Sequence, residues 1–325
     1  LASPAIGLGC MNLSHGYGQR VPEAEALRAL EAAFEMGYRH FDTATLYGAT
    51  ANERLVGKAL SAKRGELLLA SKCGMAMDPE QGRKVIDGRP ATLRRQCEES
   101  LARLQTDHID LYYLHRWDRS VPIEESVGEL GRLVEEGKIG AVGLSEVSAQ
   151  TLRRARAEHP IAAVQSEYSL WTRNPEIAVL EACREAQTLF VAFSPLGRGF
   201  LAGAVRQRER LAEGDMRRGM PRFSDEYLPR NLALLAELEA VARELEVSSG
   251  QLALGWLRAK GEDILPIPGT CSVAHMRENL AAEGLRLEAT TVTRLDALLA
   301  PERITGARYG EAQQAEVDTE ECTQA

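Results

Sequence analysis

Short runs of apolar residues alternate along this chain with longer segments in which apolar residues recur every three or four positions. The short runs are typical of parallel strands buried on both faces, and the longer segments are typical of helices with one buried face. The alternation predicts eight pairs of strand and helix. The predicted strands cover residues 5–9, 37–42, 66–72, 109–115, 140–145, 162–166, 189–194 and 263–268. The predicted helices after them cover residues 22–36, 52–60, 90–104, 123–136, 149–158, 175–186, 248–260 and 273–283.

The regular alternation breaks after the seventh strand, where residues 197–229 form a long segment rich in arginine. Structureless segments longer than about 12–15 residues are uncommon in compact domains unless they act as lids or binding loops. A lid or binding loop is one interpretation, and a solvated surface segment is the other. Two further helices are predicted at 231–246 and 290–299, before an acidic and partly mobile tail at about 305–325.

Eight strand and helix units without a break in composition predict a single domain, residues 1–325, folded as a (β/α)8 barrel, or TIM barrel. A doubly wound sheet is the alternative. That fold usually carries a Gly-x-Gly-x-x-Gly turn after its first strand, whereas here Cys10-Met11-Asn12-Leu13-Ser14 follows that strand. The barrel is therefore the prediction, with a long loop after strand seven and additional helices near the C-terminus.

The composition narrows the class of protein further. The chain has 325 residues, 44% of them hydrophobic, and no apolar run approaches the ~18 residues that a membrane-spanning helix needs. Its formal net charge of -8 argues against nucleic acid as a main partner, because phosphate backbones bind basic surfaces. The six cysteines are scattered without a Cys-x-x-Cys pair, which favours reduced thiols in a cytoplasmic protein.

Four polar side chains stand at or just beyond the ends of predicted strands. Asp42 ends the second strand, and Tyr47 follows it in a tight loop. Lys72 ends the third strand and His115 ends the fourth. An acid at a strand end is also a common structural cap, so Asp42 alone does not indicate catalysis. In a barrel, however, the carboxyl ends of all the strands meet at one rim, and that rim carries the chemistry. The four side chains are therefore candidate catalytic residues.

Together these side chains suit proton transfer to a carbonyl oxygen. A lysine beside a tyrosine favours the phenolate, so Lys72 is expected to lower the pKa of Tyr47 below its usual value of about 10. Asp42 would hold Lys72 in place and keep it charged. Tyr47 would donate its proton as a general acid, while His115 orients the same oxygen through a hydrogen bond. The histidines are isolated along the chain, so no metal site is predicted.

Proton donation alone does not reduce a carbonyl group, so a hydride source must also bind. Three later strand ends suit a nicotinamide ring. Ser145 and Gln165 would hold its carboxamide, and Phe193 would stack on the ring. Residues of these types are more often core or loop residues, and they carry weight only together with the four candidate catalytic residues.

Several segments, in the same order along nearly the whole chain, match one known family. They are Ile6-Gly7-Leu8-Gly9-Cys10-Met11, Phe41-Asp42-Thr43-Ala44 with Tyr47-Gly48, Asn52-Glu53-Arg54-Leu55-Val56-Gly57, Ser71-Lys72, Leu114-His115, Gly143-Leu144-Ser145, Gln165-Ser166-Glu167-Tyr168-Ser169, Ser194-Pro195-Leu196-Gly197-Arg198-Gly199, and Ile267-Pro268-Gly269-Thr270 with Glu278-Asn279. In these segments the chain resembles the aldo-keto reductases. The resemblance implies a (β/α)8 barrel and NADPH-dependent reduction of a carbonyl compound, with Tyr47 as the proton donor, assisted by Asp42, Lys72 and His115.

The same resemblance implies which residues contact the cofactor. The loop that begins at Ser194 would lie along the pyrophosphate, and residues 269–279 would receive the adenosine end. A helix N-terminus after strand eight suits a phosphate group in any family. The expected cofactor residues are Met11, Ser145, Gln165, Phe193, Ser194, Leu196, Gly197, Arg198, Gly269, Thr270, His275, Glu278 and Asn279.

Three residues depart from the family pattern. Glu146 stands where relatives often have an asparagine, and a carboxylate accepts from the carboxamide but cannot donate to it. Phe193 replaces a common tyrosine and still offers a ring for stacking. Cys271 stands where a lysine or arginine often contacts the 2′-phosphate of NADPH, so NADH stays possible as the cofactor unless His275 or Arg277 supplies the charge.

Two other functions stay open beside the reductase. An NAD-linked alcohol dehydrogenase of the same fold would agree with Cys271. A redox-sensing regulatory subunit would bind the cofactor tightly and turn over slowly.

The expected substrate is a small carbonyl compound, apolar or aromatic. Its pocket is predicted to contain Trp117, Tyr168 and Trp171, together with Met11 and the tail near Tyr309. For Tyr168 and Trp171, packing in the core is the alternative.

Overall fold

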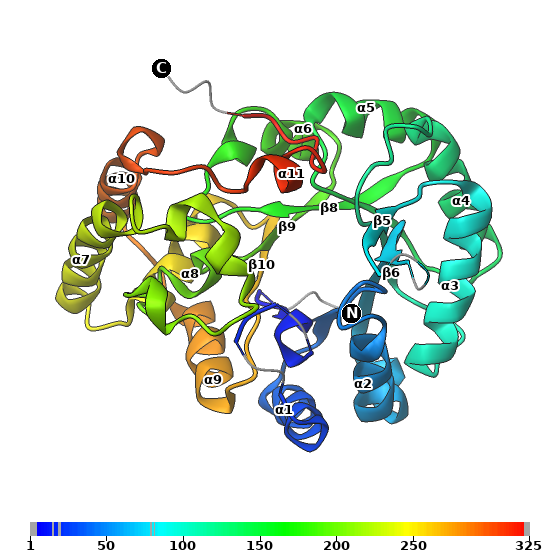
Figure 1. Ribbon diagram of the computed structural model, residues 1–325, viewed down its shortest axis with the longest axis horizontal. Coiled ribbons are helices and arrows are strands. Elements are labelled where there is room, and N and C mark those ends of the chain that lie inside the picture. Colours follow the sequence, from blue (N-terminus) through cyan, green and yellow to red (C-terminus); the bar gives the residue numbers. More distant parts are fainter. Residues whose placement is uncertain (1–4, 15, 19–20, 79, 81, 322–325) are drawn as a thin grey trace.

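The computed structural model describes residues 5–14, 16–18, 21–78, 80 and 82–321. Eight parallel strands form a barrel at the centre of the molecule (Figure 1). A parallel bridge between Gly9 and Gly269 brings the first and last strands together. In their order around the barrel, the strands are β1 (Leu8–Gly9), β2 (His40–Asp42), β3 (Leu68–Cys73), β6 (Leu111–Leu114), β7 (Val142–Ser145), β8 (Ile161–Glu167), β9 (Leu189–Phe193) and β10 (Ile264–Ile267).

Helices surround the barrel on its outside (Figure 1). The predicted (β/α)8 architecture is therefore confirmed. The helices that alternate with the strands are α1 (Glu23–Met36), α2 (Ala51–Leu60), α3 (Pro90–Leu104), α4 (Ile123–Glu135), α5 (Ala149–Glu158), α6 (Val179–Glu185), α8 (Ser249–Lys260) and α9 (Val273–Ala281). The additional helices are α7 (Leu228–Glu244), α10 (Ala289–Leu298) and the short α11 (Glu311–Gln314). None of the helices in the described ranges is long and apolar enough to cross a membrane.

The strands are apolar on both faces because each face packs against a different layer. One large group of buried side chains lies between the strands and the helices. A second group fills the inside of the barrel, as the alternation of side chains along a strand requires. This second group consists of Ala70, Leu111, Tyr113, Ala163, Val191, Leu265 and Ile267.

Two local details go beyond the predicted strands and helices. Between β3 and α3 the chain forms a small antiparallel hairpin of β4 (Met75–Met77) and β5 (Lys84–Ile86). The side chain of Asn52, in the first turn of α2, does not cap this helix. It donates to the Cys10 carbonyl and the Ser14 hydroxyl and accepts from Thr43, and so it fixes the loop after β1 to the loop after β2.

The C-terminal segment, predicted as a partly mobile tail, packs against the barrel. Asp318 accepts hydrogen bonds from the backbone and hydroxyl of Ser148 and from the hydroxyl of Thr151, at the start of α5. Glu320 accepts from the backbone N–H of Ala149. Carboxylates are favoured at a helix N-terminus, where N–H groups lack partners within the helix. The acidic composition of this segment therefore has a structural use. Residues 322–325 lie outside the described part.

The arginine-rich segment after β9 fits both interpretations. It folds into short 3-10 turns before α7. Arg198 and Arg217 line the central cavity, as expected of a binding loop. Arg206 and Arg208 form ion pairs with Glu239 and Asp225 away from that cavity, as expected of a solvated surface.

A test of the barrel interior follows from Gly143 on β7. A Cβ atom at this position would lie 2.3 Å from Cδ1 of Tyr113, whose ring is fully buried. Gly143→Ala is expected to lower the free energy of unfolding by about 1–3 kcal/mol, because an overpacked core cannot relax freely. Urea unfolding of the variant beside the wild type measures the change.

Gly65→Ala is the matched control, since a Cβ there meets nothing within 4 Å. Equal stability of the two variants would contradict the packing described here.

Candidate active site

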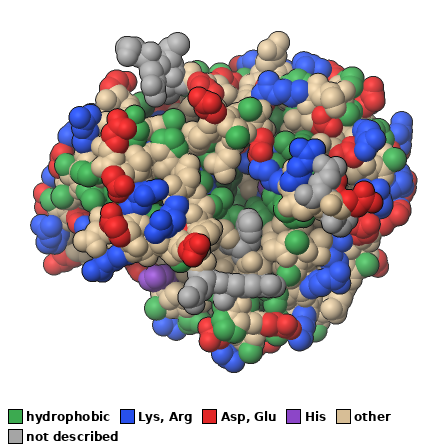
Figure 2. Space-filling view, viewed as in Figure 1, with side chains coloured by type: hydrophobic (Ala, Val, Ile, Leu, Met, Phe, Trp, Pro, Cys, Tyr) green, Lys and Arg blue, Asp and Glu red, His purple; other side chains and the backbone are tan. Residues whose placement is uncertain are grey.

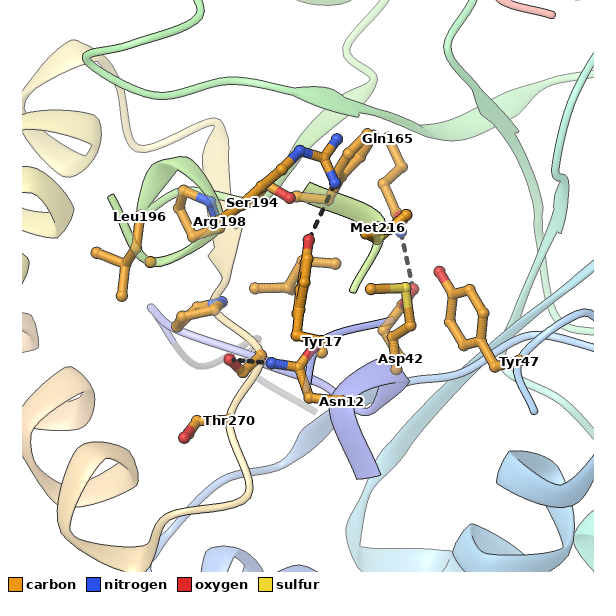
Figure 3. Close-up of a pocket in the computed structure, with 18 of the residues that line it drawn as sticks. Asn12, Tyr17, Asp42, Tyr47, Gln165, Ser194, Leu196, Arg198, Met216 and Thr270 are labelled. Atoms are coloured by element: carbon orange, nitrogen blue, oxygen red, sulfur yellow. Dashed lines mark hydrogen bonds between the residues drawn. The ribbon is translucent and has the colours of Figure 1, made fainter. Parts of the chain in front are cut away.

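A cavity of about 740 Å³ opens at the carboxyl ends of the strands. Figure 2 shows the hollow near the middle of the face in view, and Figure 3 shows side chains that line it. Asp42, Tyr47 and His115 line this cavity. Lys72 is fully buried behind Asp42. The fold therefore brings the four candidate catalytic residues together at one end of the cavity.

Asp42 and Lys72 form an ion pair that water does not reach. Their side chains are 3% and 1% exposed. The Lys72 ammonium donates to Asp42 Oδ1 and, at 2.8 Å, to the Thr43 carbonyl. Burial alone would lower the pKa of Lys72, but the Asp42 carboxylate and the Tyr47 oxygen outweigh it and raise that pKa. Lys72 therefore stays charged.

Tyr47 lies beside this lysine. The Lys72 ammonium sits 5.0 Å from the centre of the Tyr47 ring and hydrogen-bonds its hydroxyl. Burial nevertheless raises the pKa of Tyr47, and Lys72 only opposes this rise. The predicted lowering of the Tyr47 pKa was wrong, because desolvation of the phenolate exceeds the attraction of a lysine already paired with Asp42. Tyr47 thus carries its proton at neutral pH.

His115 completes the group as a neutral imidazole. Burial and the positive charges of Arg116 and Lys72 hold the pKa of His115 well below its usual value. Its ring meets the Tyr47 ring edge-on, with the centres 5.7 Å apart. The ring makes no hydrogen bond to the described residues, and its Nδ1 is buried without a partner. A neutral ring can still donate one hydrogen bond to a ligand.

The expected cofactor residues extend from this end along the cavity. Gly197 alone among the thirteen is absent from its lining. The others that line it are Met11, Ser145, Gln165, Phe193, Ser194, Leu196, Arg198, Gly269, Thr270, His275, Glu278 and Asn279. Gln165 also donates to Asp42 Oδ2 at 2.8 Å, which joins the two parts of the site (Figure 3).

The loop after β9 has an unusual backbone. Ser194 and Arg198 both have positive φ, at 48° and 58°. Residues other than glycine adopt this conformation rarely, and mostly where the surrounding structure fixes it. Here Arg198 is fixed by an ion pair with Glu167 and by bonds to the hydroxyls of Tyr17 and Tyr309. Tyr17 therefore reaches across the cavity from the loop after β1 (Figure 3).

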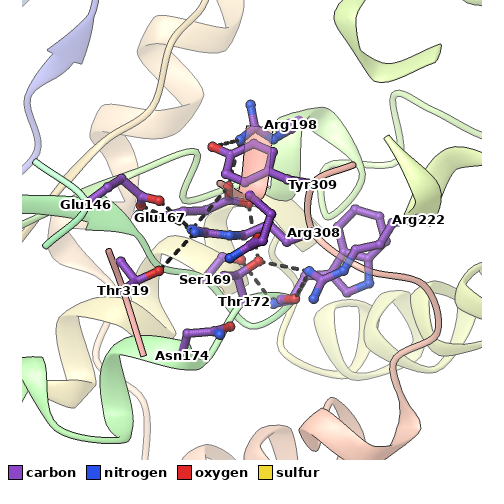
Figure 4. A network of polar contacts seen from close by, with 12 residues as sticks. Glu146, Glu167, Ser169, Thr172, Asn174, Arg198, Arg222, Arg308, Tyr309 and Thr319 are labelled. Carbon is purple, nitrogen blue, oxygen red and sulfur yellow. Dashed lines mark hydrogen bonds and ion pairs between the residues drawn. The ribbon is translucent and has the colours of Figure 1, made fainter. Parts of the chain in front are cut away.

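Glu146 does not face the cavity, contrary to the prediction that it would meet a carboxamide. Both its oxygens accept from Arg308, and one also accepts from the backbone N–H of Glu167. Figure 4 shows this buried network, which continues through Glu167 to Arg198. The φ of 55° at Glu146 turns its side chain to this network, away from the direction of Ser145.

The far end of the cavity is formed by the start of α9. Ser272 caps this helix by accepting from the backbone N–H of His275. Asn279 is buried there, and Glu278 accepts from the hydroxyl of Ser248. Cys271 is exposed and is not part of the lining.

Of the residues predicted for the substrate pocket, Met11 and Tyr309 line the cavity, whereas Trp117, Tyr168 and Trp171 do not. Tyr168 packs edge-on against Phe190 in the core. Trp171 stacks on Phe200 with ring centres 3.9 Å apart. Trp117 donates to the Val121 carbonyl beside α4. Aromatic side chains bury more apolar area than most others, so their packing in the core is strongly favourable.

Other residues occupy the space at the catalytic end. Arg116 follows His115 directly, and a charged residue so close to a strand end could have been predicted to lie at the rim. Lys84 comes from the hairpin and Glu316 from the C-terminal segment, and only the fold brings these two together, at 2.5 Å. The lining residues that the sequence did not single out include Asn12, Tyr17, Leu46, Met75, Lys84, Arg116, Met216, Gln313 and Glu316.

Comparison with known proteins agrees with this arrangement. The model of the aldo/keto reductase family matches residues 5–300. The chain belongs to this family. Two curated aldo/keto reductases are each 42% identical to it: "Aldo-keto reductase yakc [NADP(+)]" of Schizosaccharomyces pombe and "Probable aldo-keto reductase 1" of Glycine max. Each alignment covers 94% of this chain, with 91% and 88% of the respective relatives. The protein is thus an oxidoreductase.

Solved aldo/keto reductases share the fold. The glycerol dehydrogenase AKR11B4 of Gluconobacter oxydans superposes with a TM-score of 0.83 at 27% identity, covering 94% of this chain and 95% of that one. An aldo/keto reductase of Klebsiella pneumoniae, solved with NADP and acetate, has a TM-score of 0.71 at 29% identity, with the same coverage.

The buried ion pair makes a prediction for stability. Asp42→Asn leaves the Lys72 charge without its counter-charge, and is expected to lower the free energy of unfolding by about 3–5 kcal/mol. Asp42→Asn combined with Lys72→Met removes both charges and should cost less than Asp42→Asn alone. Urea unfolding of the wild type, both single variants and the double variant measures the coupling.

Glu35→Gln is the control, because Glu35 pairs with Lys63 at the surface and its loss should be much smaller than that of Asp42→Asn. If the loss of stability in the double variant equalled the sum of the losses in the two single variants, Asp42 and Lys72 would not be coupled.

Proposed function

We propose that the protein reduces aldehydes or ketones to alcohols with NADPH, and that Tyr47 donates the proton. The observation that carries this proposal is the contact of a protonated Tyr47 with a buried, charged Lys72 at the edge of the cavity. The family and its NADP-bound members support the choice of cofactor.

The cavity suits a dinucleotide in its chemistry. Polar side chains of Ser145 and Gln165 lie beside the Phe193 ring at one end, as a carboxamide on a flat ring requires. The capped start of α9 lies at the other end, where a helix N-terminus favours phosphate. Between them, the guanidinium groups of Arg198 and Arg217 line the cavity and offer N–H donors. When bound, the nicotinamide would supply a hydride to the carbonyl carbon.

The chain's own residues would then manage the proton. Tyr47 holds a proton at its hydroxyl and gives it to the carbonyl oxygen as negative charge develops there. The nearby Lys72 ammonium stabilises the phenolate that remains, and Asp42 keeps Lys72 in position. His115, being neutral, donates one hydrogen bond that orients the carbonyl oxygen without adding a second positive charge.

An NAD-linked alcohol dehydrogenase is the second candidate. The absence of a basic side chain at the exposed Cys271 favours it, because NADP recognition depends on a positive charge near the 2′-phosphate. The likeness to a solved glycerol dehydrogenase supports an alcohol as the substrate, but it does not bear on the choice between NAD and NADP.

We also propose a cytoplasmic location, with no nucleic acid as partner. The five cysteines among the described residues are free thiols, and four of them are buried. Reduced thiols are typical of that compartment. Cys322 lies outside the described part.

Tyr47→Phe tests the proposed proton donor. It removes the hydroxyl and keeps the ring, so kcat for an aldehyde is expected to fall by on the order of 10²–10⁴. NADPH binding, followed by fluorescence quenching, should stay close to that of the wild type.

Tyr112→Phe is the matched control. Tyr112 is buried on β6, the strand that His115 follows, and its hydroxyl lies 3.3 Å from the Ser100 hydroxyl, outside the cavity. It should retain kcat. Retained activity in Tyr47→Phe would remove Tyr47 from the mechanism.

Parallel fluorescence titrations with NADPH and NADH test the cofactor. NADPH is expected to bind more tightly, and the difference should shrink as ionic strength rises, because exposed charges are screened. Cys271→Arg should widen the difference by adding a positive charge beside α9. Equal or tighter binding of NADH by the wild type would move the function to the NAD-linked dehydrogenase and leave the catalytic group unchanged.

A further inference from the structure

Four lysine or arginine side chains line the cavity in the described part of the chain: Lys84, Arg116, Arg198 and Arg217. Three of them are neutralised by carboxylates. Lys84 pairs with Glu316, Arg198 with Glu167, and Arg217 with Asp215. Arg116 forms no ion pair with any described residue, so it is the cation of this lining that lacks a counter-charge.

Arg116 is held in place at one end only. Its Nη1 donates to the His115 carbonyl at 2.6 Å and to the Ser145 hydroxyl at 3.1 Å. Its Nη2 makes no hydrogen bond to the described residues, and its Nε is buried without a partner. A guanidinium has five N–H donors, so most of this one's capacity is unused.

The carboxylates nearest in the network pair with other bases, although the charge of Arg116 also contributes to the lowered pKa of Glu146. Glu146 and Glu167 are matched by Arg308 and Arg198, two acids against two bases. Asp42 is matched by Lys72 in the same way. The positive charge of Arg116 also reaches the candidate catalytic residues: after burial it contributes to the low pKa of His115, and it opposes the rise in the pKa of Tyr47 that burial causes.

We infer that Arg116 binds a carboxylate of the substrate, and that the preferred substrates are aldehydes or ketones that carry one carboxylate group. This inference rests on the proposed carbonyl reduction. Arg116 follows His115 in the chain, so it lies next to the site of reaction. One uncompensated positive charge matches a single negative charge. Lys84 is already neutralised by Glu316, so no second lysine or arginine without an ion pair stands among the described lining residues to bind a dianion.

Arg116 has one competing role, which is to hold the Ser145 hydroxyl in position for the cofactor. The two roles predict different results. An anion site acts on charged substrates alone, whereas a support for Ser145 acts on all substrates equally.

The test uses pairs of substrates that differ in charge and little in shape. These are the 2-, 3- and 4-carboxybenzaldehydes and the corresponding carbamoylbenzaldehydes. In the wild type, kcat/KM for the best carboxylate is expected to exceed that of its amide at least about tenfold, or about 1.4 kcal/mol. In Arg116→Gln the ratio should approach one. Arg116→Lys should retain part of it, because lysine keeps the charge but not the shape of the donor group.

Arg156→Gln is the control for the loss of one positive charge, since Arg156 is exposed on α5 and does not line the cavity. It should keep the ratio of the wild type. A wild type without preference for the carboxylate, or an Arg116→Gln variant in which both substrates lose equally, overturns the inference.

A binding experiment separates this inference from the proposed function. Calorimetric titration with 4-(hydroxymethyl)benzoate and 4-(hydroxymethyl)benzamide needs no turnover. Tighter binding of the benzoate by the wild type, lost in Arg116→Gln, supports the anion site even if no aldehyde is reduced, a result that would refute carbonyl reduction alone. Equal binding of the two compounds overturns the anion site.

Discussion

The burial of a charged lysine beside a carboxylate is the constraint on which the rest of the site depends. Removing both groups from water is unfavourable, and their mutual attraction offsets this only when the geometry is good and the remaining donors are satisfied. The barrel provides that geometry because β2 and β3 are neighbours in register, so that Asp42 and Lys72 end on the same rim. Gln165 and the Thr43 carbonyl take the remaining bonds. The candidate active site is thus built around an ion pair that forms only when β2 and β3 lie side by side in this register.

A second buried charge network performs a different task. Arg308 and Arg198 belong to segments without regular strands, and they reach Glu146 and Glu167 at the ends of β7 and β8. Such pairs contribute little net stability, because burial of the charges opposes their attraction. Their effect is positional. They fix the C-terminal segment and the loop after β9 beside the cavity, and they bring Tyr309 into its lining.

The two networks determine which charges line the cavity. The end of the cavity near Tyr47 combines a neutral His115, a protonated Tyr47 and an Arg116 that forms no ion pair with the described residues. This end is more polar than the aromatic pocket that the sequence predicted. For Tyr168 and Trp171 the sequence left two places open, the substrate pocket and the core. They lie in the core, since a ring gains more from burial on all sides than from lining a wet cavity.

The sequence by itself determined the barrel and the place of the four candidate catalytic residues. Both follow from local patterns: apolar runs alternate with amphipathic segments, and a polar residue at the end of a parallel strand must lie at the common rim. Position 42 and position 72 could be placed without knowing any contact. The tertiary structure alone decided what the charges do. Glu146 turns from the cofactor to Arg308, 162 residues away, and Lys84 meets Glu316, 232 residues away. Such pairs depend on how loops that are distant in the chain pack together. The pattern of residues within one segment does not indicate this packing.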